Sequence, residues 1–195
     1  MVEEILEAVK GYLARYPKVR LQLLAIDRPV DLIEERIDVA LRVRSVLEGD
    51  AALTMRSLGE STRILVAAPA LASRLRTVEE LATVPTLATS DEDSVRQWRL
   101  QTEDGRSHLL RHEPRMGCAS FGAVREAAIA GLGVALLPDH YCRQALDRGD
   151  LVRLLPEWRG RRGVVHLVFT TRRGLTPAVR ALIDHLASAR FARAS

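Results

Sequence analysis

The chain has 195 residues, of which 47% are hydrophobic and 28% are charged, and its formal net charge is +4 at pH 7. This composition is ordinary for a globular protein with a sizeable core, and no apolar stretch approaches the ~20 residues that a membrane-spanning helix needs. The positive charge is almost entirely arginine scattered along the chain, with only Lys10 and Lys18 as lysines. Direct nucleic-acid binding by these residues is therefore not favoured, because a basic face or a reading motif should accompany it.

The residue types that hold metals or mark export are sparse. Cys118 and Cys142 are too few and too far apart for a disulfide framework or a zinc site, and the histidines never pair at ligand spacing. We expect no metal and no cofactor. The N-terminal residues lack the basic start and apolar centre of a secretory signal, so a cytoplasmic location is expected.

The first part of the chain predicts alternating helices and strands. Apolar residues at helical spacing predict a helix that Pro17 ends. Alternating apolar residues predict strands over 19–23 and 39–43, with a short helix between them that Asp27 caps. After a polar stretch over 45–50, the runs LTMRSL and RILVAA predict two further strands.

The middle of the chain carries several local signals. Pro69 opens a short helix, and Thr77 with Glu80 predicts a capping box. PTLAT predicts a strand. VRQWRL and SHLLRHEPRMG predict two strands joined by a turn at Asp104 and Gly105.

The stretch AGLGVALLPD decides between a nucleotide-binding loop and ordinary backbone punctuation. Ser120 caps the preceding helix, Gly131 ends it in a left-handed conformation, and Gly133 leads into a strand. Pro138 closes that strand, and Asp139 caps the next helix. In a dinucleotide-binding fold the glycines follow a strand and open a helix. The order is reversed here, so the sequence argues against nucleotide binding.

The last part of the chain predicts two strands, a loop between them and a final helix. The strands are LVRLL and VVHLVFT, and the loop is rich in glycine and arginine, with Arg159, Arg161 and Arg162. The final helix begins at Thr176. Alternating strands and helices indicate an α/β fold with mostly parallel sheets.

Four separated motifs, in the right order, resemble the effector-binding domain of LysR-type transcriptional regulators. They lie at 12–43, 58–73, 125–158 and 170–190, so the resemblance covers nearly the whole chain. It implies a periplasmic-binding-protein-like (type II) fold, in which two Rossmann-like α/β subdomains are joined by two crossing strands. Subdomain I would hold residues 1–67 and 167–195, and subdomain II residues 68–166.

The resemblance also implies a function. In this family a small-molecule effector, here an anionic or aromatic one, binds in the cleft between the subdomains, changes their relative orientation and so modulates transcription. The family's winged helix-turn-helix is absent from the chain, so DNA binding would need that N-terminal domain. The family's first strand is absent as well. The crossings would run from Arg63 to Ala68 and from Val164 to Thr170.

Two residues carry the predicted chemistry of the effector site. Ser120 lies where a helix N-terminus presents unpaired N–H groups, so its hydroxyl could donate to a carboxylate; alternatively it is only a helix cap. Arg42 could clamp an anion with its guanidinium; alternatively it is a surface arginine or pairs with Asp27 or Asp31.

The remaining predicted site residues shape the cleft. Phe121 forms an apolar wall or is an ordinary packing residue. The resemblance places four more residues along the same cleft: Ala68, Pro69, Pro138 and Thr170. His166, within an apolar strand, is expected to be a core histidine with satisfied hydrogen bonds.

Two other classes of function fit the residues less well than a sensing domain. Catalysis is not expected. The acidic pairs Glu34-Glu35 and Glu79-Glu80 lie on predicted helices, where solvated charges are typical, and the GCAS loop with Cys118 has no His or Asn partner pattern. A periplasmic-type solute-binding protein for small-molecule transport would share the fold but needs an export signal.

Self-association is also expected from the resemblance. It implies a homodimer or tetramer in which the helix from Glu3 to Tyr16 packs against the helix from Phe121 to Ala130 of another copy. An apolar seam at this contact, or alternatively the core of each copy, would hold Tyr12, Leu13, Val124 and Ala128.

Overall fold

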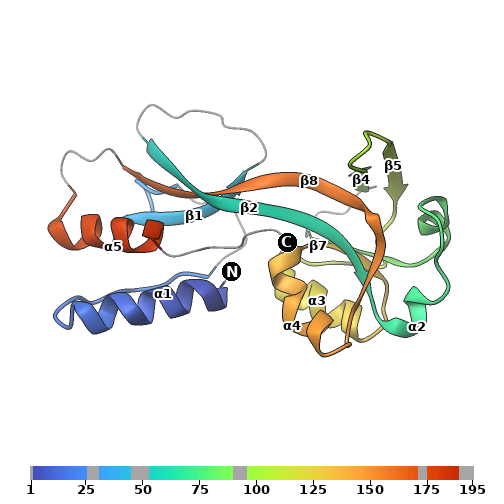
Figure 1. Ribbon diagram of the computed structural model, residues 1–195, viewed down its shortest axis with the longest axis horizontal. Helices are drawn as coiled ribbons and strands as arrows, with labels where there is room; N and C mark the ends of the chain where they lie inside the picture. Colours follow the sequence, from blue (N-terminus) through green and yellow to red (C-terminus); the bar gives the residue numbers. More distant parts are fainter. Residues whose placement is uncertain (1, 26–30, 45–52, 90–95, 171–174, 189–195) are drawn as a thin grey trace. The chain divides into compact units, whose positions relative to one another are not determined.

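The computed structural model describes residues 2–25, 31–44, 53–89, 96–170 and 175–188 (Figure 1). The helices are α1 (Val2–Arg15), α2 (Pro69–Ala72), the 3₁₀ helix η1 (Glu79–Thr83), α3 (Phe121–Ile129), α4 (Asp139–Asp147) and α5 (Pro177–Ser188). The strands are β1 (Val39–Arg44), β2 (Leu53–Ala67), β3 (Thr86–Ala88), β4 (Arg96–Gln101), β5 (Ser107–His112), β6 (Met116–Gly117), β7 (Val134–Pro138) and β8 (Val152–Thr170).

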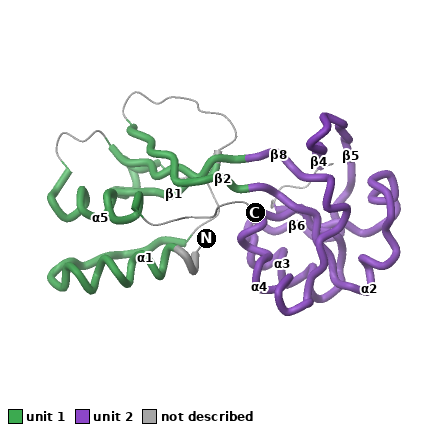
Figure 2. Tube along the Cα trace, in the orientation of Figure 1, with its two compact units in different colours: residues 1–61, 163–195 green, residues 62–162 purple. Residues whose placement is uncertain are grey.

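The chain divides into two compact units, which Figure 2 shows in different colours. Unit 1 holds residues 1–61 and 163–195, and unit 2 holds residues 62–162. The long strands β2 and β8 each run from one unit into the other. The boundaries expected from sequence lie a few residues further along both strands.

Both long strands correct the sequence-based prediction. LTMRSL and RILVAA belong to one strand, β2, and the glycine- and arginine-rich segment predicted as a loop lies inside β8. Its composition suggested a turn, but its backbone is extended beside neighbouring strands; Arg159, for example, is paired with Gln101 of β4. Strand pairing therefore outweighs the local preference of glycine for turns.

Unit 2 is a curled sheet whose order is β5-β4-β8-β2-β7-β3-β6. Among the described pairs with an assigned direction, β3 runs parallel to β6 and to β7, whereas β2–β7, β4–β5 and β4–β8 are antiparallel. The expectation of mostly parallel pairing was therefore wrong. The hairpin β4–β5 and the long strands supply antiparallel pairs that helix–strand alternation does not predict.

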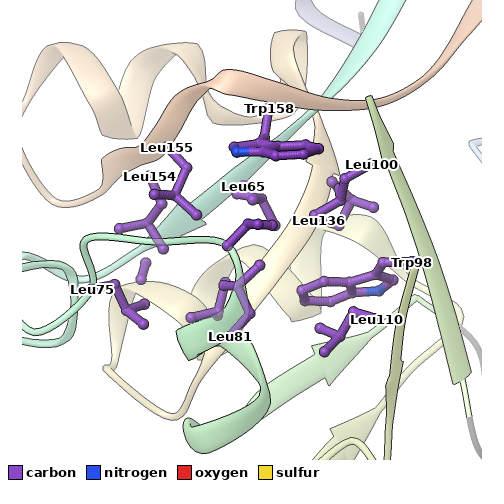
Figure 3. Close-up of a cluster of buried hydrophobic side chains, with 13 residues drawn as sticks. Leu65, Leu75, Leu81, Trp98, Leu100, Leu110, Leu136, Leu154, Leu155 and Trp158 are labelled. Atoms are coloured by element: carbon purple, nitrogen blue, oxygen red, sulfur yellow. The ribbon is translucent and has the colours of Figure 1, made fainter. Parts of the chain in front are cut away.

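Alternate residues of β2 face two separate cores in unit 2. Ile64 and Val66 pack with α3 and α4, whereas Leu65 and Ala67 pack on the opposite side against the hairpin β4–β5 and η1. Figure 3 shows Trp98 and Trp158 among the leucines of this second cluster. Truncation of a fully buried leucine in either cluster should cost about 2–5 kcal/mol.

The two glycines of AGLGVALLPD have distinct structural roles. Gly131 ends α3 with φ at +75°, a conformation that other residues rarely adopt. At Gly133 a Cβ atom would lie 2.7 Å from the carbonyl oxygen of Pro85, so β7 approaches the start of β3 too closely for a side chain. Both glycines follow the helix and precede the strand, as the sequence predicted.

In unit 1, α1 and α5 pack on one face of a sheet in which β1 runs antiparallel to β8. The two helices lie side by side in Figure 1. The buried hydroxyl of Tyr12 donates to the carbonyl of Ala178 at 2.7 Å, and His185 Nε2 lies 2.9 Å from the carbonyl oxygen of Ala8. Long-range polar contacts thus fix α5 on α1.

Two predictions between α1 and β1 were wrong. Residues 19–23 form no strand, because an alternating pattern becomes a strand only where a neighbouring strand pairs with it, and none does so among the described residues. In the described part of the short predicted helix, residues 32–36 form a turn in which the Asp31 carboxylate accepts from Ile33 N–H at 2.8 Å and Glu34 N–H at 2.9 Å. The predicted cap, Asp27, lies outside the described residues.

Local signals in unit 2 were closer to the structure. The hairpin β4–β5 is confirmed, although SHLLRHEPRMG divides into β5 and the separate strand β6. Half of the predicted capping box forms, with Glu80 Oε2 accepting from the backbone N–H of Thr77 at 3.1 Å. The helix that follows is the 3₁₀ helix η1, and its first residue has no side-chain cap.

Candidate functional site

The N-terminus of α3 carries the residue with the clearest predicted chemistry. β6 lies beside β3, and Cys118 N–H donates to the carbonyl of Ala88 at 3.1 Å, which fixes the chain just before the helix. Ser120 is exposed and extended, and its Oγ accepts from the Ala123 N–H at 3.4 Å. The predicted cap is confirmed. The first N–H groups of any helix point outward without helical partners, which makes this end favourable for an anion.

An arginine from β2 and two aromatic rings lie beside this helix end. Arg63 is opposite Pro138 in the antiparallel pair β2–β7. Its guanidinium carbon lies 5.9 Å from the centroid of the Phe121 ring. The Phe121 and Tyr141 rings are 5.1 Å apart between centroids. We call Arg63, Ser120, Phe121 and Tyr141 the α3 cluster; all four belong to unit 2.

The electrostatics of the α3 cluster combine a cation with a nearby carboxylate. The Arg63 side chain is exposed, and partial desolvation by the protein around it lowers its pKa from the ordinary value, although an arginine keeps its charge at neutral pH. Burial alone would raise the pKa of Asp139, but hydrogen bonds from His140 and from the Thr62 backbone hold it below its ordinary value. Asp139 Oδ1 accepts from the His140 N–H at 2.8 Å. The carboxylate of Asp139 is therefore hydrogen-bonded to its neighbours, and Arg63 supplies a positive charge beside Phe121 at the N-terminus of α3.

Two other predicted site residues of unit 2 lie at the far end of α3. Ala68 is buried directly after β2, and its carbonyl accepts from the N–H groups of Leu71 and Ala72 in α2, whose first residue is the exposed Pro69. The Ala68 Cβ would be 3.9 Å from a Cβ on Gly131, at the C-terminal end of α3. The structure therefore places Phe121 and Pro138 beside Arg63, with Ser120 the residue before Phe121, whereas Ala68 lies near Gly131 at the other end of α3.

Arg42 and Thr170 belong to unit 1. Arg42 is half-buried in β1 opposite His166 of β8. Hydrogen bonds from Glu34 and Ile33 lower the pKa of Asp31, and the charge of Arg42 adds to this effect. A role for Arg42 in effector binding stays a prediction. Thr170 is the half-buried last residue of β8.

His166 departs from its sequence-based prediction. It is 5% exposed, as expected of a core residue. However, neither ring nitrogen has a hydrogen-bond partner in the part of the chain that the structure describes. The alternating apolar pattern predicted the burial correctly, but it carried no information about which polar groups would surround the ring.

Three residues of the expected association seam lie in the core of their own unit. Tyr12, Val124 and Ala128 are each at most 1% exposed, and Leu13 is half-buried. On α1 the apolar residue with the largest exposed fraction among those described is Leu6, at 40%. Helical periodicity identified the apolar face but not whether that face packs inward or against another copy.

No group of three His, Cys, Asp or Glu side chains that could hold a metal ion occurs in the described residues. Within the same ranges, no helix combines the length and the apolar character needed to cross a membrane.

Sequence reasoning missed Arg63 and Tyr141 as members of the site. Arg63 is the one charged residue at the head of the apolar run RILVAA, and this position was a usable signal. Its proximity to Phe121 depends on the pairing of β2 with β7, which brings distant parts of the sequence together. Tyr141 had no comparable signal, because its position follows from the packing of α4 on α3.

Comparisons with known proteins agree on one family. A family model described as the LysR substrate binding domain matches residues 4–190. The HTH-type transcriptional regulator PtxR of Pseudomonas aeruginosa is 28% identical over 179 residues, covering 90% of this chain and 56% of PtxR. CrgA of Neisseria meningitidis, also an HTH-type transcriptional regulator, is 29% identical over 146 residues, covering 73% of this chain and 48% of CrgA. The chain thus spans about half the length of these relatives.

Solved structures show the same similarity. Full-length AphB, the virulence activator of Vibrio cholerae and a member of the LTTR protein family, superimposes with a TM-score of 0.82 at 26% identity, covering 95% of this chain and 63% of AphB. The regulatory domain of CrgA has a TM-score of 0.81 at 23% identity and covers 98% of this chain and 94% of that domain. The latter similarity supports the fold alone.

Proposed function

Because this chain belongs to the LysR substrate-binding-domain family, we propose that it senses a small anionic effector at the α3 cluster. In this account the effector has a carboxylate or similar group and an adjoining apolar or aromatic part. Its binding changes the activity of a transcriptional regulator. The relatives reported above are transcriptional regulators, which favours this function over solute transport.

The position of Arg63 beside the first turn of α3 is the observation that carries the proposal. The guanidinium offers a planar pair of donors, and the helix end offers N–H groups with the positive end of the helix dipole. The Ser120 hydroxyl adds a further donor, because its oxygen accepts from Ala123 N–H while its own proton can be donated to the effector. Together these groups complement a carboxylate.

The rings of Phe121 and Tyr141 supply the apolar part of the proposed contact. They lie 5.1 Å apart, and the Phe121 face is also occupied by the Arg63 guanidinium. An aromatic effector could replace part of this stacking with its own ring. Pro138, opposite Arg63 in the sheet, would border the same contact.

The other predicted contacts remain part of the proposal. Arg42 and Thr170 in unit 1, and Ala68 and Pro69 at the far end of α3, are each predicted to affect effector binding. A substitution at any of them that weakens binding without unfolding the protein would support its assignment.

DNA binding and assembly are proposed for the whole regulator rather than shown by this chain. PtxR and CrgA are HTH-type regulators, and we assign DNA contact in the whole regulator to a helix-turn-helix of that kind. A cytoplasmic location follows from this role. Assembly into a homodimer or tetramer is proposed through the helix from Glu3 to Tyr16 and the helix from Phe121 to Ala130. If this is right, Leu6→Glu should shift sedimentation toward monomer, whereas Leu23→Glu should not.

The proposed function is tested by calorimetric titration of the protein with a panel of aliphatic and aromatic carboxylates, amino-acid derivatives and neutral analogues. We expect at least one carboxylate to bind and its amide or ester analogue not to bind. Arg63→Gln should lower the affinity for that carboxylate by about tenfold or more, because a charge-assisted hydrogen bond is lost.

Arg74→Gln is the matched control for this titration. Arg74 is exposed in unit 2, and its side chain makes no hydrogen bond or ion pair with the described residues. It should bind the carboxylate like the wild type. Equal weakening in both variants, or preference for the neutral analogue, would contradict the assignment of Arg63.

A further inference from the structure

The hairpin β4–β5 has one buried and one exposed face. Trp98, Leu100 and Leu110 are buried and point into the core cluster of unit 2 (Figure 3). Every second residue points the other way, and the exposed set consists of Gln97, Arg99, Gln101, Ser107, Leu109 and Arg111. The hairpin therefore presents a polar face with one large apolar side chain, since Leu109 is 46% exposed.

β5 is an edge strand of the sheet. It is the first strand in the order β5-β4-β8-β2-β7-β3-β6, and its pairing within the described ranges is with β4 alone. An edge strand presents backbone N–H and C=O groups that can pair with a further strand. At this edge the unpaired backbone lies next to the exposed hairpin face.

Two arginines on this face lack a carboxylate partner. Arg99 lies opposite Leu109, and Arg111 lies opposite Gln97. The two arginines are therefore diagonal neighbours on one face of the hairpin, and this register puts their backbones about 7–8 Å apart. Across the described residues neither side chain makes an ion pair or hydrogen bond.

Nearby arginines differ from this pair. Arg106 in the hairpin turn bonds Asp104 at 3.0 Å, and Arg159 of β8 pairs with Glu103. The carboxylates of the turn are thus already engaged by other arginines. Within the described ranges, Arg99 of β4 and Arg111 of β5 therefore flank the exposed Leu109 without an ion pair, although the exposed Glu113 follows two residues after Arg111.

We propose that β5 is a docking edge for an acidic segment of another protein, which adds to the sheet as an extended strand. Main-chain hydrogen bonds along the edge would supply affinity, and alternate side chains would supply specificity. A strand beside β5 places an acidic residue against Arg111 and, two positions away, an aliphatic residue against Leu109. A second copy of this chain fits less well, because its own β5, Ser107–His112, would bring a further arginine, Arg111, and no carboxylate.

The test uses a rhodamine-labelled peptide, Thr-Asp-Thr-Val-Thr-Asp-Thr, which presents Asp, Val and Asp on one face in either strand direction. Fluorescence anisotropy should show binding that weakens with added NaCl. Arg111→Glu should lower the affinity by about tenfold or more, and Arg99→Glu by several-fold. Arg74→Glu, at an exposed position elsewhere in unit 2, should bind like the wild type. Hydrogen exchange should slow at Ser107–His112.

Backbone pairing is tested separately from charge. Two N-methylated peptides are compared, one methylated at the amides of its even positions and the other at those of its odd positions. Their affinities should differ, because only one of the two sets of amides faces the edge of β5. A peptide with Lys in place of Asp should not bind. The proposal is overturned if nothing binds at about 1 mM peptide, or if both N-methylated peptides bind equally well. A labelled DNA duplex bound in preference to the peptide, and lost in Arg111→Glu, would also overturn it, because the face would then be a phosphate-binding surface.

Discussion

The guanidinium of Arg63 lies over the ring of Phe121, with 5.9 Å between the guanidinium carbon and the ring centroid. This contact joins strand β2 to the first residue of α3 within unit 2. It places a cation, an aromatic face and a helix N-terminus together, and the proposed recognition of an anionic effector depends on that combination.

The Arg63–Phe121 contact should be measurable as a coupling energy. In a double-mutant cycle with Arg63→Met and Phe121→Leu, we expect about 0.5–1 kcal/mol of coupling in the free energy of unfolding. Urea denaturation of the four proteins measures it. Strictly additive effects would mean that the guanidinium gains nothing from the ring.

Substitution of Ser120 separates its two roles. Ser120→Ala removes the cap of α3 and should cost about 1 kcal/mol of stability. Ser120→Asp keeps a capping oxygen and suits the helix dipole, so the free energy of unfolding should be nearly unchanged. The added negative charge should nevertheless lower the affinity for an anionic effector by about tenfold or more, because like charges at short range repel each other. If Ser120→Asp binds normally, Ser120 is a cap and not an effector contact.

The two cysteines should differ sharply in reactivity. Burial raises the pKa of Cys142 to about 12, so almost none of it is thiolate at neutral pH. Cys118 is only half-buried. With Ellman's reagent, native Cys118→Ser should release little product until guanidinium chloride is added, whereas native Cys142→Ser should react readily. Rapid reaction of native Cys118→Ser would contradict the burial of Cys142.

His112 should make stability depend on pH. Its Nδ1 is 2.6 Å from Thr86 Oγ1, and burial, followed by the charge of Arg96, lowers its pKa in the folded protein. The unfolded chain, with a pKa of about 6.5, binds the proton first as the pH falls. The contribution of neutral His112 to the free energy of unfolding is therefore fully present above about pH 6.5, and it is lost as the pH falls through the folded-state pKa.

The check is thermal unfolding of wild type and His112→Gln across this pH range. The variant should lose part of the decrease in unfolding temperature on acidification, while Arg111→Gln on the same strand should keep it. An identical pH profile in wild type and His112→Gln would show that the imidazole is not responsible.

The sequence predicted local structure well where one residue type has one clear physical role. Gly131 at the end of α3, the cap at Ser120 and the turn of the β4–β5 hairpin follow from backbone geometry that is encoded within a few residues. Residues 19–23 show the limit, because their alternating pattern was read without knowledge of a pairing partner.

The candidate site was predicted in part for the same reason. Ser120 and Phe121 were found because a helix N-terminus is visible in sequence, whereas Arg63 reaches them only through the pairing of β2 with β7. Helical spacing left open whether Tyr12 lies in an association seam or in the core, and the structure places it in the core of its own unit.

Hydrogen exchange of the protein with and without a carboxylate that binds in calorimetry tests the central claim most directly. The account predicts slower exchange at the backbone amides of Phe121, Gly122 and Ala123 and along β2 at Arg63, in wild type but not in Arg63→Gln. Protection confined to other parts of the chain, with these amides unchanged, would contradict it.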